Sequence, residues 1–218
     1  DEDAGRLRER LIDHLAPAAN ERLVVKDPIA VFSSHWLQRE FGLRVLCLVR
    51  HPAGFASSLL RWNWEFFFGY FTAQPRLMES FDDDIRDEIE RFARERQEPI
   101  RQACLLWKAV YSWLIATDPA GDSWIWSRYE DLAADPTPAF RDLFERLRLP
   151  WTDAVGERIE ALTSERNPRE SEDPAFRPRN SRAMRLVWRD RLSSEQVALI
   201  KDLTDPVWRR FYQPRDWE

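Results

Sequence analysis

Two cations in this sequence stand where an anion-binding site could form. Lys26 ends the short run RLVVK (22–26), and Arg50 follows the run LRVLCLV (43–49), in which six of seven residues are apolar. The first run is rich in β-branched residues, and the second has the composition of a strand buried on both faces. In Lys-Asp-Pro and Arg-His-Pro, a proline then starts a helix. Cations beside helix N-termini bind oxyanions because side chains and backbone N–H groups converge on the same oxygens.

The elements that must position these cations alternate along the chain. Strands are expected at 22–26, at 43–50 and in SWIWSR (123–128), with helices at 28–42 and from Pro52 onward. Such alternation predicts an α/β fold in which a parallel sheet is flanked by helices. Because ligands of open parallel sheets bind beyond the carboxyl ends of the strands, Lys26 and Arg50 are expected to face one crevice.

Four other segments complete the expected single domain, residues 1–218. Apolar spacing predicts a first helix over 7–15. The stretch 78–99 is expected to be a charged, solvated helix and 100–117 a buried one, and a helix-rich C-terminal part follows. The segment 164–182 contains three prolines and five arginines and lacks hydrophobic periodicity. It is therefore expected to be a long basic loop, and loops of this length are usually functional or disordered.

Composition excludes several classes of protein. The formal net charge of −5 argues against a general nucleic-acid binder. Cys47 and Cys104 lie in apolar runs and are expected to be buried free thiols in a reducing compartment. The acidic N-terminus is unlike a signal peptide, and no apolar run approaches the ~18 residues that cross a bilayer. We therefore expect a cytoplasmic protein without a membrane span; the sequence does not indicate its oligomeric state.

The stretch LCLVRHPAGFASSL (46–59) resembles the 3'-phosphate-binding motif of sulfotransferases that use 3'-phosphoadenosine 5'-phosphosulfate (PAPS). In that family a strand ends in Arg, Pro follows, and Ser comes eight residues after the Arg. The resemblance implies that Arg50 and Ser58 bind the 3'-phosphate of the donor. It also implies a sulfotransferase-like fold related to the P-loop NTPases. VVKDP (24–28) resembles the family's Lys-Asp-Pro element, especially in the tyrosylprotein and bacterial branches, which places Lys26 at the transferring sulfuryl group as the catalytic cation.

Two further segments are similar to the same family. YEDLAADP (129–136) resembles its Tyr-Glu-Asp-Leu stretch, and WRDRLSSEQ (188–196) resembles its C-terminal segment, where cations of a loop cover the 3'-phosphate. Among the loop arginines 177, 179 and 182, Arg182 is the first choice because it stands nearest the following helix. PAPS is then the co-substrate, and no metal is implied.

The sequence also departs from the family pattern. The six glycines are isolated, so none forms the family's N-terminal phosphosulfate loop. The catalytic His of the cytosolic branch is replaced by Ile29, and neither His35 nor Glu65 is a convincing base. The first strand, loop and helix of the family would need at least ~30 further residues. We therefore expect the 218 residues to be part of a longer chain and to be inactive alone, which an upstream-extended chain would test.

The sequence thus predicts a sulfotransferase that moves a sulfuryl group from PAPS to a hydroxyl or amine of an acceptor. The aromatic stretch 61–71 favours a small apolar or aromatic acceptor, although half of it would serve the core. Two alternatives remain open: a nucleotide or nucleoside kinase-like P-loop protein, and a non-catalytic sulfotransferase-like binding domain.

Overall fold

The computed structural model describes residues 24–26, 30–170 and 178–218. The chain divides into two compact units, residues 1–31 and 32–218. In the first unit, residues 24–26 are exposed and have no regular secondary structure. The strand predicted over 22–26 is therefore wrong for these three residues. Strand propensity reflects packing on a pleated, half-buried surface, and Val24 is 74% exposed. The predicted helix over 7–15 lies outside the described residues.

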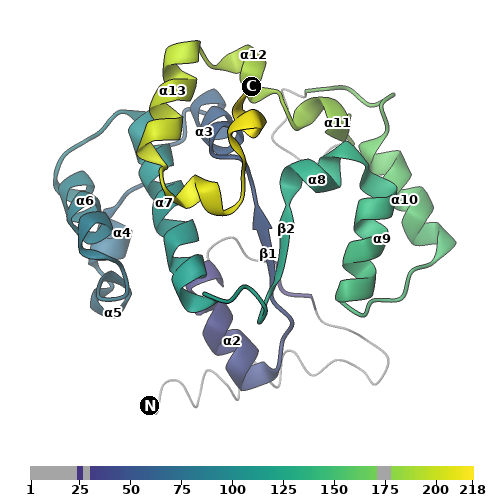
Figure 1. The fold of residues 1–218 in the computed structure, drawn as a ribbon, viewed down its shortest axis with the longest axis horizontal. Helices are drawn as coiled ribbons and strands as arrows, with labels where there is room; N and C mark the ends of the chain where they lie inside the picture. Colours follow the sequence, from purple (N-terminus) through teal and green to yellow (C-terminus); the bar gives the residue numbers. More distant parts are fainter. Residues whose placement is uncertain (1–23, 27–29, 171–177) are drawn as a thin grey trace. The chain divides into compact units, whose positions relative to one another are not determined.

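The second unit is a mixed α/β structure with far more helix than strand (Figure 1). A 3₁₀ turn, η1 (Ala30–Ser33), leads into it. The strands are β1 (Leu46–Val49) and β2 (Ile125–Arg128). The helices up to β2 are α2 (Ser34–Phe41), α3 (Pro52–Arg61), α4 (Gly69–Thr72), α5 (Pro75–Met78), α6 (Asp83–Arg94) and α7 (Pro99–Thr117). Those after β2 are α8 (Tyr129–Ala134), α9 (Pro136–Arg146), α10 (Asp153–Thr163), α11 (Ser181–Met184), α12 (Trp188–Arg191), α13 (Ser194–Leu203), η2 (Val207–Arg210) and η3 (Pro214–Trp217).

The two strands pair in parallel, with Leu46 opposite Ile125 and Val49 opposite Arg128. The predicted parallel sheet is thus confirmed for these strands. The prediction that the first of them is buried on both faces is wrong. Cys47 and Val49 are buried, whereas Leu46 and Leu48 are 37% and 47% exposed. Side chains alternate between the faces of a strand, and only the face that carries Cys47 and Val49 is packed against the core.

Side chains bind the outer edges of both strands. Ile125 N of β2 donates to Val45 O. Backbone N–H and C=O groups point alternately to the two sides of a strand, so those of Leu48 and Arg50 point away from β2. The Tyr111 hydroxyl of α7 donates to Leu48 O (3.1 Å) and accepts from Arg50 N (3.4 Å), while Trp107 Nε1 donates to Arg50 O (2.9 Å). On the other side, Arg146 of α9 donates to Trp126 O of β2. Side chains of α7 and α9, the helices beside β1 and β2 in Figure 1, therefore occupy backbone groups at both outer edges of the sheet.

Replacing Tyr111 with phenylalanine tests the closure of the β1 edge. We expect the free energy of unfolding to fall by about 1 kcal/mol, because Leu48 O and Arg50 N lose their shared partner. Urea unfolding would show a lower midpoint with an unchanged slope. Tyr70→Phe is the matched control, since Tyr70 is 64% exposed and its loss of a hydroxyl should leave the midpoint unchanged. Equal midpoints for all three proteins would contradict the expected role of the Tyr111 hydroxyl.

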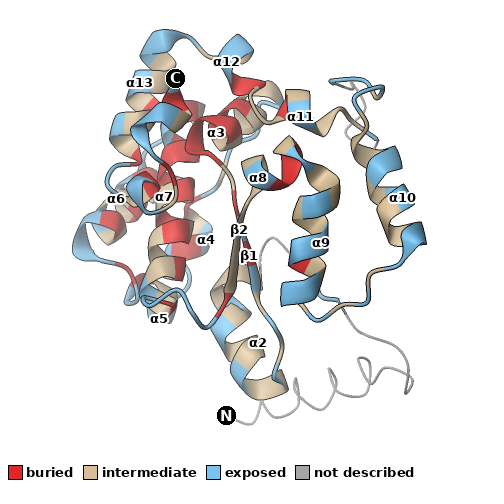
Figure 2. Ribbon diagram, turned by 45° about the vertical axis from the view of Figure 1, so that its right-hand side comes forward, coloured by how far each residue is buried: buried red, intermediate tan, exposed pale blue. Residues whose placement is uncertain are grey.

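Helix α7 forms the centre of the core, as predicted for a buried helix. Its buried residues include Leu105, Trp107 and Ala109, and it packs against α3, α6 and α13. The buried positions concentrate on this side of the sheet, whereas α9 and α10 are mostly half-buried or exposed (Figure 2). The charged helix is also confirmed, although α6 is shorter than the predicted stretch and buries a stripe of Ile85, Ile89 and Phe92.

The two cysteines are buried and unpaired, as predicted. Burial raises the pKa of the Cys47 thiol and that of the Cys104 thiol to about 12, with the charge of Asp118 adding to the shift of Cys47. Both thiols are therefore protonated at neutral pH and unsuited to nucleophilic chemistry. None of the helices in the described residues combines the length and the apolar composition of a membrane span.

Candidate anion-binding site

The turn between β1 and α3 presents Arg50 at the carboxyl end of the sheet. Pro52 is the first residue of α3 and has the fixed φ that suits this position. His51 is the N-cap, and its Nδ1 accepts a hydrogen bond from Ala53 N (3.3 Å). The backbone of Arg50 is held by Tyr111 and Trp107, as described above. The main chain around Arg50 is therefore fixed on both sides, and the positive end of the α3 dipole lies beside it.

The Arg50 side chain has a buried donor without an acceptor. Its Nε has no hydrogen-bond partner in the structure, although the side chain is only partly buried. Its guanidinium carbon lies 5.0 Å from the centre of the Tyr129 ring, in cation–π contact. A β-carbon at Gly54 would lie 3.4 Å from Arg50 Nε, in ordinary van der Waals contact, so the Arg50 side chain packs closely on this part of α3. A buried N–H donor of a cation is costly to leave unpaired, which makes an anionic ligand favourable here.

A second arginine lies near the same tyrosine. Burial raises the pKa of the Tyr129 hydroxyl, the charges of Arg50 and Arg179 oppose that shift, and Glu130 adds to it. Arg179 precedes α11, and its backbone N–H donates to Leu162 O (3.0 Å). The charges of Arg50 and Arg179 thus both act on the Tyr129 hydroxyl, although the two arginines come from distant parts of the sequence.

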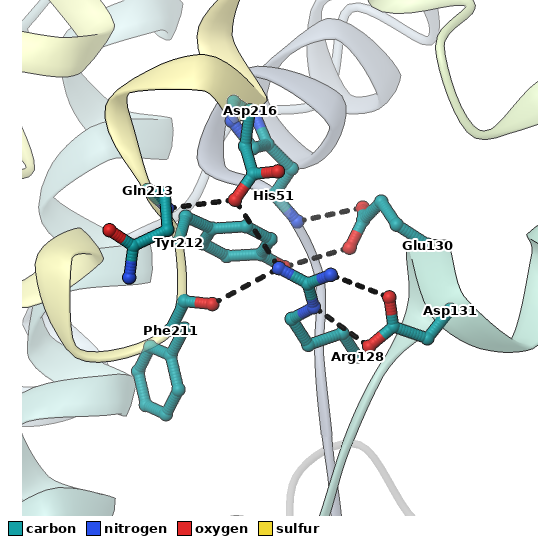
Figure 3. Close-up of polar contacts among 8 residues, drawn as sticks. All are labelled: His51, Arg128, Glu130, Asp131, Phe211, Tyr212, Gln213 and Asp216. Atoms are coloured by element: carbon teal, nitrogen blue, oxygen red, sulfur yellow. Dashed lines mark hydrogen bonds and ion pairs between the residues drawn. The ribbon is translucent and has the colours of Figure 1, made fainter.

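Glu130 joins the Arg50 turn to the C-terminal segment (Figure 3). Its Oε1 accepts from His51 N (3.0 Å), and its Oε2 accepts from the Tyr212 hydroxyl (2.8 Å). Burial raises the pKa of Glu130, while the bonds from His51 and Tyr212 and the charge of Arg50 limit the rise. Both oxygens are therefore already engaged, and Glu130 positions the turn instead of presenting a free base.

Arg128, the last residue of β2, fixes the same segment from the other side. Its guanidinium pairs with Asp131, bonds Asp216 (3.3 Å) and donates to Phe211 O (3.3 Å) (Figure 3). The Asp216 carboxylate in turn accepts from Gln213 N (2.7 Å). Arg128 is thus a structural cation, because its donors are used within the protein.

His51 lies in an aromatic box and is kept neutral. Its ring stacks on Trp188 (5.1 Å between centres) and meets the edges of Tyr212 (4.8 Å) and Trp217 (4.3 Å). Burial lowers its pKa to about 3; Asp216 opposes the shift, and the charges of Arg189, Arg128 and Lys201 add to it. Its Nε2 has no hydrogen-bond partner in the structure. His51 is only 2% exposed, so its position serves packing and helix capping and gives it no access to a substrate proton.

The predicted site residues are not all brought together. Lys26 is exposed and belongs to the first unit, whereas Arg50 belongs to the second. The common crevice expected for the two cations therefore stays a prediction. Ser58 is half-buried on α3, and no side-chain hydrogen bond to it is seen among the described residues. The neighbouring Ser57 is buried instead, and its hydroxyl lies 3.5 Å from Arg191 Nη1.

Arg182, the first choice in the basic loop, is engaged elsewhere. Its Nη1 pairs with Glu165 (2.7 Å) and its Nε donates to Ala134 O (2.9 Å). The open groove that it lines also carries Asp135 and Glu160. A groove with three carboxylates disfavours a phosphate, so Arg182 does not extend the site around Arg50 in this structure.

Sequence reasoning did not single out Arg185. It follows α11, a helix that packs on α8, and its Nε is buried without a hydrogen-bond partner in the structure. A helical signal was present in the sequence, since Asn180 caps α11 and Met184 is its buried residue. At 100° per residue, Arg185 lies about 100° from Met184 and Arg182 about 160°. The helical phase therefore places Arg185 nearer the core side than Arg182.

The described glycines do not form a phosphate loop. Gly42 ends α2 in the left-handed conformation, and Gly54, Gly69 and Gly156 lie in helices. Glu65 pairs with Arg96 (2.7 Å); the hydrogen bond from Arg96 lowers the pKa of that carboxyl, so it is a poor general base. Within residues 24–26, 30–170 and 178–218, the site therefore offers anion anchors without an evident cradle for a phosphosulfate.

The aromatic stretch 61–71 is divided between core and surface. Phe68 and Phe71 are buried in the cluster between α4, α6 and α7, and Phe66 packs against it. The exposed members are Trp62 (48%), Trp64 (43%), Phe67 (63%) and Tyr70 (64%). The expectation that about half of these residues serve the core is confirmed.

Comparisons with protein-family models, with curated proteins and with solved structures found no match for this chain.

Proposed function

We propose that this chain binds the 3'-phosphate of a PAPS-type donor at the carboxyl end of β1 and belongs to a sulfotransferase. The observation that carries the proposal is the buried, unpaired Nε of Arg50, fixed at a strand end beside the N-terminus of α3. Arg179 adds a second cation near Tyr129. The order of Arg, Pro and Ser in the sequence supports a 3'-phosphate as the ligand over other anions.

In this proposal the residues divide the work of sulfuryl transfer. Arg50 and Arg179 anchor the donor, and Ser58 lies two turns along α3 from the same end of the sheet. Lys26 stabilises negative charge on the bridging oxygen as the sulfuryl group moves in line to the acceptor. By analogy with phosphoryl transfer, positioning and charge neutralisation supply most of the catalysis. The general base is left unassigned, because Glu65, Glu130 and His51 are all unsuited to that task.

A non-catalytic nucleotide-binding domain is the second candidate. It is favoured by the absence of a glycine-rich phosphate loop among the described residues, since such a loop would hold the 5' end of the donor. A kinase-like protein would need the same loop, so its absence among the described residues also counts against a kinase.

Calorimetry with 3'-phosphoadenosine 5'-phosphate (PAP) and with ATP separates these functions. We expect PAP to bind at least about tenfold more tightly, because only PAP carries the phosphate that Arg50 would recognise. Equal or tighter binding of ATP would favour the kinase-like alternative. Binding of PAP without turnover, for this chain and for one extended upstream, would favour the binding domain.

The acceptor class is tested separately with labelled PAPS. We propose a small apolar or aromatic acceptor, because the exposed aromatic residues Trp62, Trp64 and Phe67 follow α3 directly. Phenols and lipidic alcohols should accept sulfate better than highly charged polysaccharides. The reverse preference would overturn this part of the proposal and leave the donor assignment intact.

A further inference from the structure

A cluster of ion pairs lies at the other end of α3 from Arg50. Arg61, the last residue of α3, donates through Nη1 to Glu170 Oε2 (2.6 Å). Arg191, the last residue of α12, donates through Nε (3.1 Å) and Nη2 (2.5 Å) to Glu170 Oε1. The remaining Arg191 nitrogen, Nη1, faces the buried Ser57 hydroxyl. One carboxylate is thus held by two guanidinium groups.

The cations belong to the packed body of the unit, whereas the carboxylate comes from a loop. The side chains of Arg61 and Arg191 are 23% and 18% exposed, and that of Glu170 is 36% exposed. The helices that end in these arginines, α3 and α12, pack against each other. Glu170 lies after α10 in residues without regular secondary structure. A loop carboxylate thus bridges two less exposed cations that end packed helices.

The chemistry of this arrangement is that of a bound oxyanion. Burial tends to raise the pKa of Glu170, but the hydrogen bonds from Arg191 and the charges of Arg191, Arg61 and Arg169 lower it. The carboxylate is therefore ionised at neutral pH. Guanidinium groups bind carboxylates, phosphates and sulfates through the same pairs of N–H donors. Ser57 adds a hydroxyl that is 2% exposed.

We infer that Arg61, Arg191 and Ser57 form a second oxyanion site, which Glu170 occupies in this structure and which a phosphate or sulfate group takes in competition with Glu170. Arg61 is separated from Arg50 by the ten residues of α3, or about 15 Å, whereas Ser57 lies midway along the helix. The second oxyanion site does not depend on sulfuryl transfer. Glu170 acts here as an internal ligand that lowers the apparent affinity for external anions.

Glu170→Gln tests the competition because it removes the charge and keeps the shape. Inorganic phosphate is titrated by calorimetry at constant ionic strength. We expect the variant to bind phosphate about tenfold more tightly than the unaltered protein, and Glu170→Gln/Arg191→Gln to lose the gain. Asp87→Asn is the matched control, since Asp87 is an exposed carboxylate of α6 without an ion pair among the described residues, and its loss should leave the affinity unchanged.

Two outcomes overturn the inference. Equal or weaker phosphate binding by Glu170→Gln would make Glu170 a structural tether, and a gain that persists in the double variant would place the phosphate elsewhere. If Glu170→Gln does not fold, a phosphate titration of the unaltered protein followed by NMR tests the inference instead. The Arg191 Nε–Hε signal should shift and saturate with phosphate but not with chloride at equal ionic strength. The absence of such a shift would also overturn the inference.

Discussion

Replacing Arg50 with alanine is expected to weaken PAP binding by about 10- to 150-fold, or 1.5–3 kcal/mol. The variant loses a charge-assisted contact at a guanidinium whose Nε is buried and otherwise unpaired. Calorimetry on the purified variant measures this loss directly. Circular dichroism should show unchanged helix content, because the backbone of Arg50 remains held by Tyr111 and Trp107.

Two variants sharpen this experiment. Arg50→Lys keeps the charge and loses the guanidinium fork, so it should recover only part of the affinity. Arg209→Ala removes an exposed arginine that pairs with Asp205 and should leave PAP binding unchanged. If Arg50→Ala binds PAP as well as the unaltered protein, the assignment of the β1 end as the phosphate site is wrong.

Acidification is expected to destabilise the protein through His51. The pKa of His51 is lowered by burial to about 3 in the folded protein, and a histidine in an unfolded chain titrates near 6.5. The stability that the neutral imidazole contributes is therefore complete above pH 6.5 and is lost as the pH falls toward 3. Each unit in this window should cost about 1.4 kcal/mol, or about 2 kcal/mol by pH 5. Urea unfolding at pH 7, 6 and 5 measures the slope.

His51→Asn separates this contribution from those of neighbouring groups. The asparagine oxygen can replace Nδ1 as the acceptor of the Ala53 N–H, and it does not titrate. Glu130 works in the opposite direction, since its raised pKa favours the folded state on acidification. Glu130 is present in both the unaltered protein and His51→Asn, so the difference between their slopes of stability against pH excludes its contribution. Parallel slopes would contradict a buried, neutral His51.

The strand and helix around Arg50 were predictable because their signals are local. An apolar run that ends at a cation, a proline at the first helical position and a glycine at the end of α2 each act within a few residues. The exposure of Leu46 and Leu48 was not predictable in this way. An apolar run cannot reveal that only one face of a strand will be covered, because the covering helix, α7, comes some fifty residues later.

The candidate site was predictable only in part for the same reason. Arg50 was found from its position at a strand end, whereas the choice of Arg182 over Arg179, and the omission of Arg185, turned on long-range contacts that the sequence does not reveal. Arg182 is engaged by Glu165 and Ala134, and Arg179 acts on Tyr129. Likewise, the hold of Glu170 on Arg61 and Arg191 joins residues that are 109 and 21 positions apart.

The occupied edges of the two-stranded sheet bear on strand pairing between copies of this chain. An open strand edge is a template for pairing with another chain, which leads to domain swapping and aggregation. A strand added beside β1 would first have to break the bonds of Tyr111 and Trp107 to Leu48 and Arg50. One added beside β2 would have to displace Arg146 from Trp126 O. Three side chains thus occupy the groups that an added strand would need, so edge-to-edge pairing would have to displace them first.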